Sequence, residues 1–196
     1  MTISSFEVEV KVAIRDTEDV STKLSNLGAV HTNTEKQVDI YFNHPCKSFE
    51  STDEALRVRK RENLVVHDKS KTGPESKLEL TYKGPKIDQV SKTRFEMSTS
   101  IGDIESAKST LVHLGFIEIA TVTKERMFYS IKDMVVSIDL VKDVGSFLEI
   151  EKVVESEDEI PVAREHIFSF LESIGLDRHD SIRESYLELL LRKEHS

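Results

Sequence analysis

The sequence predicts an α+β fold in which one antiparallel sheet closes into a barrel and carries its helices on the outside. Two observations lead to this prediction. The chain contains an internal duplication in which each copy reads as a strand, a helix and three further strands, and no linker separates the copies. The strands also place charged residues on one face and apolar residues on the other. We therefore expect a single domain over residues 1–196, with halves at about residues 6–92 and 93–190.

The first copy begins with a strand at residues 6–12. Val20, Leu24 and Leu27 then recur at helical spacing, and Gly28 supplies the usual C-terminal stop of a helix. Residues 67–76 are polar and contain Gly-Pro, which predicts a hairpin loop. The remaining strand-like runs of this copy are residues 38–42, 55–61 and 77–84.

The second copy repeats this order, with a helix that ends at Gly115. Its strand-like runs are residues 94–101, a segment ending at residues 127–129, residues 134–141 and residues 147–153. A turn at Gly145 separates the last two runs. Beyond the duplication, apolar residues at helical spacing from Ile160 to Ile174 predict a helix that ends at Gly175. Ser181 and Glu184 form the pattern of a capping box for a last helix.

The composition is that of a soluble globular protein with an acidic balance. The 196 residues include 27 Lys and Arg against 36 Asp and Glu, for a formal net charge of −9. Such a charge argues against a general binder of nucleic acid or of an anionic membrane. No apolar run approaches the ~18 residues of a membrane span, and the N-terminal residues lack the pattern of a secretory signal. With Cys46 as the single cysteine, we expect a cytoplasmic protein without a zinc site.

Alternation with period two assigns the charged residues of the strands to one face of the sheet. A solvated surface is the simplest interpretation, but repeated Glu and Lys in strands, and like charges on one strand, cost stability. A wet lumen inside the barrel explains the whole set better. The expected lumen cations are Lys11, Arg57, Arg59, Lys83, Arg94, Lys124 and Arg126. The expected lumen carboxylates are Glu7, Glu9, Glu96, Asp139, Glu149 and Glu151.

These two sets of charge predict different ligands. Clustered cations are typical of a site for an anion with many oxygens, and a polyphosphate fits. Clustered carboxylates without soft ligands suit Mg²⁺ or Mn²⁺ bridging to phosphate. Mutual neutralisation in a salt-bridge network without a ligand is the alternative that the pattern leaves open. Asp39 and Tyr41 are expected at one entrance, and Tyr186 is expected to pack within the helical region rather than to contact a ligand.

The segment EVEVK at residues 7–11 resembles the ExExK signature of the CYTH superfamily, the triphosphate tunnel enzymes. Later charged landmarks follow in the order of that family, and the match spans roughly residues 6–190. The segments that resemble the CyaB-type class IV adenylate cyclases within it are DIYFNHP (39–45), TDEALRVR (52–59), LTYKGPK (80–86) and SIDLVKDVGSFLEIE (137–151).

The resemblance implies a closed eight-stranded antiparallel barrel with flanking helices and a nucleoside triphosphate lying along its tunnel. The implied reaction converts ATP to cyclic AMP and pyrophosphate with Mg²⁺ or Mn²⁺ as the cofactor. A metal-dependent triphosphatase acting on inorganic, nucleoside or thiamine triphosphate is the alternative, and a binding module without turnover is a third hypothesis. The resemblance is also compatible with a homodimer, although no surface stripe in the sequence identifies an interface.

The family motifs imply a role for each charged position. The expected catalytic residues are Glu7, Glu9, Lys11 and Glu149. The expected phosphate-binding residues are Lys11, Arg57, Arg59, Lys83, Arg94, Lys124 and Arg126. The expected metal ligands are Glu7, Glu9, Asp139, Glu149 and Glu151.

Overall fold

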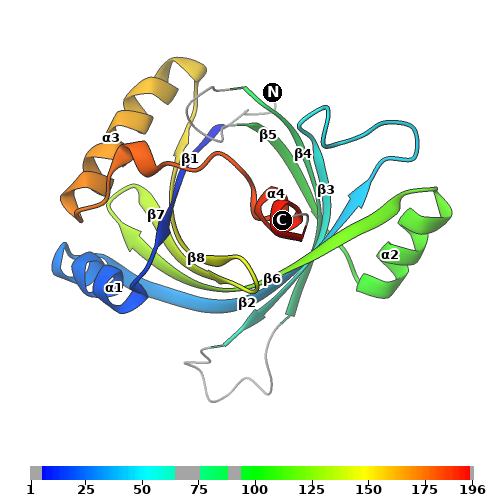
Figure 1. Cartoon of the computed structure of the whole chain (residues 1–196), viewed down its shortest axis with the longest axis horizontal. Coiled ribbons are helices and arrows are strands. Elements are labelled where there is room, and N and C mark those ends of the chain that lie inside the picture. The colour runs from blue at the N-terminus through cyan, green and yellow to red at the C-terminus, as the bar shows by residue number, and fades with distance from the viewer. Residues whose placement is uncertain (1–5, 65–75, 88–93, 195–196) are drawn as a thin grey trace.

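The computed structural model describes residues 6–64, 76–87 and 94–194. Within them, eight antiparallel strands form one sheet in the order β1-β8-β7-β6-β2-β3-β4-β5. The sheet curls into a ring, which confirms the predicted fold class (Figure 1). The strands are β1 (Phe6–Ile14), β2 (Val30–Asn43), β3 (Ala55–Asn63), β4 (Ser76–Lys86), β5 (Arg94–Ser100), β6 (Ile117–Ile131), β7 (Met134–Val141) and β8 (Gly145–Val154). The predicted loop at residues 67–76 lies, except for Ser76, outside the described residues.

The sequence predicts a closed barrel, but in the described residues the two ends of the curled sheet are not joined by hydrogen bonds. β1 and β5 are the two ends of the hydrogen-bonded order, and no ladder joins them in the described part of the chain. The strands nevertheless approach each other, and the Glu96 carboxylate on β5 is near enough to Glu7 on β1 to raise the pKa of Glu7.

Helices cover the outside of the ring. Figure 1 shows α1 (Thr17–Asn26), α2 (Ile104–His113) and α3 (Ile160–Ser173) around it, and α4 (Tyr186–Glu194) over its centre. No helix in residues 6–64, 76–87 or 94–194 has the length and apolar character needed to cross a membrane. Along the chain, the element order β-α-β-β-β occurs twice before α3, as the duplication predicts.

The main apolar core lies between the outer face of the sheet and the helices. Val8, Val10 and Val12 point outward from β1 and are almost fully buried. They belong to the same buried cluster as Leu24 of α1 and Ile167 of α3. Because side chains of a strand alternate between faces, burying these valines outside turns Glu7, Glu9 and Lys11 inward. The core thus sets the direction of the charged residues.

Helix ends follow the sequence in part. Gly28 and Gly115 have φ values of 85° and 91°, so both glycines occupy the left-handed conformation that stops α1 and α2. The predicted capping box of the last helix was wrong. Glu188 N donates to Ser185 Oγ at 3.2 Å and Ser185 N donates to Glu188 Oε2 at 2.6 Å, so the box lies four residues later than predicted. Residues 181 and 182 instead attach to β1, where Ile182 N donates to the Lys11 carbonyl at 2.7 Å.

Two leucines, one in α1 and one just after it, test the outward-facing core. Leu24 is 0% exposed, whereas Leu27 just beyond the helix is 46% exposed. We expect Leu24→Ala to lower the free energy of unfolding by about 2–5 kcal/mol because it leaves a cavity between α1 and the sheet. Leu27→Ala should change it by about 0.5 kcal/mol or less. Urea denaturation followed by circular dichroism measures both, and equal losses would contradict this packing.

Candidate functional site

The curled sheet encloses a cavity of about 1180 Å³ whose walls carry side chains from both halves of the chain. All the predicted site residues line it except Lys11 and Asp139. The predicted charged face is therefore an interior surface. The predicted residues on its wall are Glu7, Glu9, Arg57, Arg59, Lys83, Arg94, Lys124, Arg126, Glu149 and Glu151.

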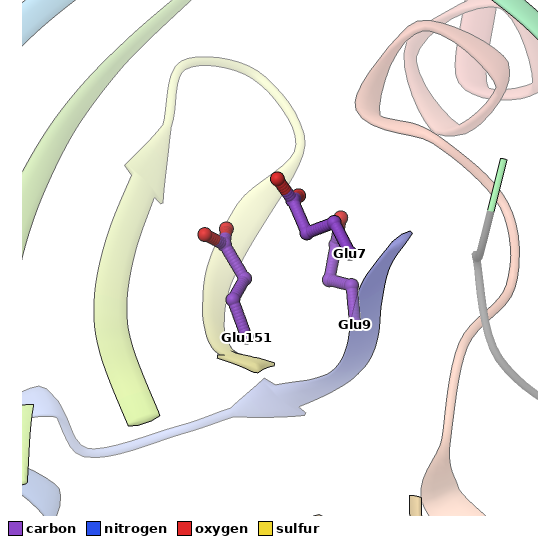
Figure 2. Close-up of side chains that lie close together, drawn as sticks. All are labelled: Glu7, Glu9 and Glu151. Carbon is purple, nitrogen blue, oxygen red and sulfur yellow. The ribbon is translucent and has the colours of Figure 1, made fainter. Parts of the chain in front are cut away.

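Three carboxylates gather on one side of the cavity. Glu7 and Glu9 follow one another on the inner face of β1, and Glu151 is the register partner of Glu9 on β8. One oxygen from each of the three lies within 4.8 Å of the others, and Figure 2 shows the side chains grouped together. Three oxygen donors in this arrangement suit a hard divalent cation such as Mg²⁺ or Mn²⁺.

The carboxylate cluster is short of positive charge. Burial raises the pKa of Glu7 to about 7, and the neighbouring Glu9 and Glu96 add to this effect. Burial also raises the pKa of Glu151 to about 8; Arg126 opposes the shift, whereas Glu7 and Glu9 reinforce it. Mutual neutralisation, the alternative that the sequence left open, is therefore incomplete at this cluster. A metal ion would supply the missing charge.

The other two predicted metal ligands are bound to cations. Glu149 forms an ion pair with Arg126. Asp139, which is 0% exposed, accepts from Arg126 Nε at 2.6 Å, Lys124 Nζ at 3.0 Å and the Tyr186 hydroxyl at 2.7 Å. Burial disfavours its charge, but Arg126 and Lys124 outweigh that and lower its pKa. In this structure Asp139 acts as a buried counter-ion, and a metal-binding role for it and for Glu149 stays a prediction.

A second buried counter-ion serves the arginines of β3. Asp39 on β2 lies opposite Arg59, whose Nη2 donates to its Oδ2 at 2.6 Å, and Arg57 Nη1 is 3.6 Å from the same oxygen. Burial opposes ionisation of Asp39, but Arg59 and Arg57 hold its pKa well below the usual range. Asp39 was expected at an entrance, yet it is 1% exposed because the long strand β2 carries it deep into the ring.

The remaining lumen cations differ in how their charge is balanced. Lys83 pairs with Glu96, while burial and Arg57 lower the pKa of Lys83. Burial and Arg126 lower the pKa of Lys124 to about 8. The buried Nε of Arg57 has no hydrogen-bond partner among the residues that the structure describes. An unsatisfied buried donor of this kind is costly, and an anionic oxygen in the cavity would satisfy it.

Lys11 and Arg94 are two predicted phosphate-binding residues whose side chains donate to backbone carbonyls. Lys11 is 0% exposed and donates from Nζ to the Glu184 carbonyl, with the ammonium beneath the Tyr186 ring. Arg94 lines the cavity, where its Nη1 donates to the Gly84 carbonyl at 3.3 Å. The phosphate-binding roles of these two residues stay predictions. Of the two, only Arg94 reaches the cavity wall directly.

Tyr186 is the functional candidate that the sequence analysis missed. It does pack in an apolar cluster with Phe147 and Leu189, as predicted. Its hydroxyl also donates to the buried Asp139, and the side chain lines the cavity, which are two features that the sequence did not predict. Helical spacing identified the apolar neighbours of Tyr186, but no local signal showed that α4 turns this residue into the lumen.

Comparisons with known proteins agree with this fold. The family profile described as the CYTH domain matches residues 5–186. A Methanocaldococcus jannaschii protein, whose name assigns it provisionally to the adenylate cyclases, is 38% identical over 183 residues, which are 93% of this chain and 97% of that protein. Adenylate cyclase CyaB of Aeromonas hydrophila is 25% identical over 186 residues, covering 94% and 88% of the two chains. A solved Pyrococcus horikoshii structure has a TM-score of 0.85 and 37% identity, covering 95% and 99%.

The raised pKa values of Glu7 and Glu151 predict a pH-dependent stability and metal affinity. Both carboxyls bind protons more tightly in the folded than in the unfolded chain, so their contribution to stability is present at low pH. It is lost as the pH rises through about 7 for Glu7 and about 8 for Glu151. The melting temperature of the metal-free protein should therefore fall over this range. Mg²⁺ should bind more tightly as the pH rises, by up to about tenfold per pH unit for each proton released.

Differential scanning calorimetry and titration calorimetry at pH 6.0 and 8.5, each with and without Mg²⁺, measure both effects. The matched control is the double variant Glu7→Gln and Glu151→Gln, which lacks both titrating groups and should lose this part of the pH dependence. A wild-type protein whose metal-free stability follows the same pH curve as the double variant would show that these carboxyls keep ordinary pKa values.

Proposed function

Because the chain belongs to the CYTH domain family, we propose that it is an enzyme that converts ATP to cyclic AMP and pyrophosphate with the help of a divalent metal ion. One observation carries the proposal. A cluster of three metal-type carboxylates shares one cavity with a set of buried guanidinium and ammonium groups. This combination suits a triphosphate that arrives with its metal ion. The names of the two curated relatives favour ATP cyclisation over other triphosphate reactions.

The cationic wall binds the triphosphate in this proposal. Arg57 offers its buried Nε, and Lys83 and Lys124 carry ammonium groups on the cavity surface. Asp39 and Asp139 balance the arginine and lysine charges while no substrate is present, which keeps these cations in place at a tolerable desolvation cost. As the α–β phosphate bond breaks, the same cations stabilise the negative charge that develops on the pyrophosphate leaving group.

Glu7, Glu9 and Glu151 are the residues that would hold the divalent ion. When bound, the ion supplies positive charge beside the triphosphate oxygens and the attacking group. The chain must also orient the ribose so that its 3′ oxygen forms a bond to the α-phosphorus. In the same step the bond from that phosphorus to the β-phosphate oxygen breaks, and the 3′ hydroxyl proton leaves to solvent. The carboxylates Glu7 and Glu9 both line the cavity in which this rearrangement would occur.

Hydrolysis of a triphosphate is the alternative function, with water in place of the ribose hydroxyl. It is supported by the composition of the cavity wall, which gathers lysine, arginine and glutamate side chains of the kinds that suit phosphate and metal. The substrate would then be inorganic triphosphate, a nucleoside triphosphate or thiamine triphosphate. The two functions share the phosphate and metal residues. They differ in the attacking oxygen and in the phosphorus atom attacked, which is the α-phosphorus in cyclisation and the terminal phosphorus in hydrolysis.

Product analysis separates the two reactions. We expect the purified protein to form cyclic AMP and pyrophosphate in equal amounts from ATP with Mg²⁺ or Mn²⁺, because the α–β bond is the one that breaks in cyclisation. Chromatography of the nucleotides and an enzymatic assay for pyrophosphate measure this, with tripolyphosphate tested in parallel. Phosphate release without cyclic AMP, or much faster turnover of tripolyphosphate, would establish the triphosphatase instead.

The carboxylate cluster can be tested by one isosteric substitution. Glu9→Gln should lower kcat by at least about tenfold, because it removes one oxygen charge from the proposed metal site while retaining the shape of the side chain. Glu118→Gln is the matched control, since Glu118 lies on the exposed part of β6 and pairs with Lys108 at 3.3 Å. Titration of activity with Mn²⁺ should show a weaker apparent metal affinity only in Glu9→Gln. An unchanged rate would remove Glu9 from the site.

A further inference from the structure

We propose that Tyr186 is a positioning residue of the phosphate site, so that the C-terminal helix takes part in binding the triphosphate. The inference rests on the proposed triphosphate chemistry. Three contacts made by this one side chain carry it. Its hydroxyl meets a buried counter-ion, its ring meets two lysine ammonium groups, and the segment before it is attached to the strand that bears one of those lysines.

The hydroxyl shares one carboxylate oxygen with two cations. Tyr186 donates to Oδ2 of Asp139 at 2.7 Å, and Lys124 Nζ donates to the same atom at 3.0 Å. Arg126 Nη2 is the third donor to this oxygen. A carboxylate oxygen has about two lone pairs for hydrogen bonds, so the three donors compete. By sharing this oxygen the tyrosine weakens the hold of Asp139 on Lys124, whose ammonium has further N–H groups to donate to a phosphate oxygen.

The ring places two ammonium groups without neutralising them. The Tyr186 ring centroid lies 4.2 Å from Lys11 Nζ and 4.7 Å from Lys124 Nζ. The negative face of an aromatic ring attracts a cation but carries no net charge. A carboxylate at this place would pair with the lysines and weaken their attraction for phosphate. The ring itself is held by Phe147, whose centroid is 5.1 Å away.

The chain before α4 couples Tyr186 to β1. Ile182 N donates to the Lys11 carbonyl at 2.7 Å, and the Lys11 ammonium donates back to the Glu184 carbonyl. The capping box of Ser185 and Glu188 then places Tyr186 in the first turn of α4. Tyr186 and Lys11 are thus held by the same short segment. A change in the position of α4 would shift both lysine contacts.

Substitutions at two positions of α4 separate a positioning role from packing. Tyr186→Phe keeps the ring and removes the hydroxyl, Tyr186→Leu removes both, and Leu189→Ala disturbs the same apolar cluster without touching a charged group. We expect the dissociation constant of tripolyphosphate to rise about 3- to 10-fold in Tyr186→Phe and further in Tyr186→Leu. It should change by less than about 2-fold in Leu189→Ala, although α4 is destabilised.

Titration calorimetry with tripolyphosphate, with melting temperatures as a check on folding, measures these affinities. With ATP as substrate, the Tyr186 variants should show a higher KM and a smaller change in kcat. A loss of packing alone would not produce this pattern. If Tyr186→Leu does not fold, Tyr186→Phe carries the test alone. Tyr186 variants that bind tripolyphosphate as Leu189→Ala does would overturn the inference. A wild-type protein that binds no tripolyphosphate would instead overturn the proposed function on which it rests.

Discussion

The structure depends on keeping ionised side chains inside a ring of strands. Moving an unpaired charge out of water costs far more than a small domain can supply, so interior charges must be paired, neutral or ligated. Asp39 and Asp139 provide the pairing for the buried cations, and each forms ion pairs with two of them. Most apolar residues of the same strands face outward and are covered by α1, α2 and α3, while an inward-facing group that includes Val141 and Phe147 packs against α4. The usual arrangement of a small barrel, with apolar side chains in its interior, is reversed here.

The pairing is uneven, and the unevenness gives the cavity its chemistry. At the arginines, carboxylate and guanidinium groups balance well enough to lower the pKa of Asp39 and Asp139. Glu7 and Glu151 have raised pKa values because burial disfavours their charged forms and neighbouring carboxylates add to the effect. One wall therefore has strong donors for an anion, and the other has oxygens in need of a cation. A triphosphate with a bound metal ion would supply both the anion and the cation.

The overall charge takes on a different meaning in this arrangement. A formal charge of −9 argues against a polyanionic ligand when the chain is treated as one surface. Several of its basic residues, however, lie buried around the cavity. An acidic chain can therefore carry a locally basic site, provided that the anion is short enough to enter the ring. Net charge limits the size of the anion more than its presence.

The sequence by itself determined which residues face inward. A strand has a period of two, so an apolar stripe at Val8, Val10 and Val12 settles the direction of Glu7, Glu9 and Lys11 without knowledge of their neighbours. Glycine stops and helical spacing located the helices for the same local reason. The duplication then supplied the element order, which the structure repeats in both halves.

Only the tertiary structure decided which inward residues meet. Asp39 lies opposite Arg59 because of the register in which β2 and β3 pair. Glu151 lies opposite Glu9 because β8 pairs with β1. Lys11 has the predicted direction but lies beneath Tyr186, which comes from a helix 175 residues further along the chain. Register, curl and the docking of α4 depend on contacts between segments far apart in sequence. A local pattern assigns a side chain to a face, and only the assembled ring gives it a partner.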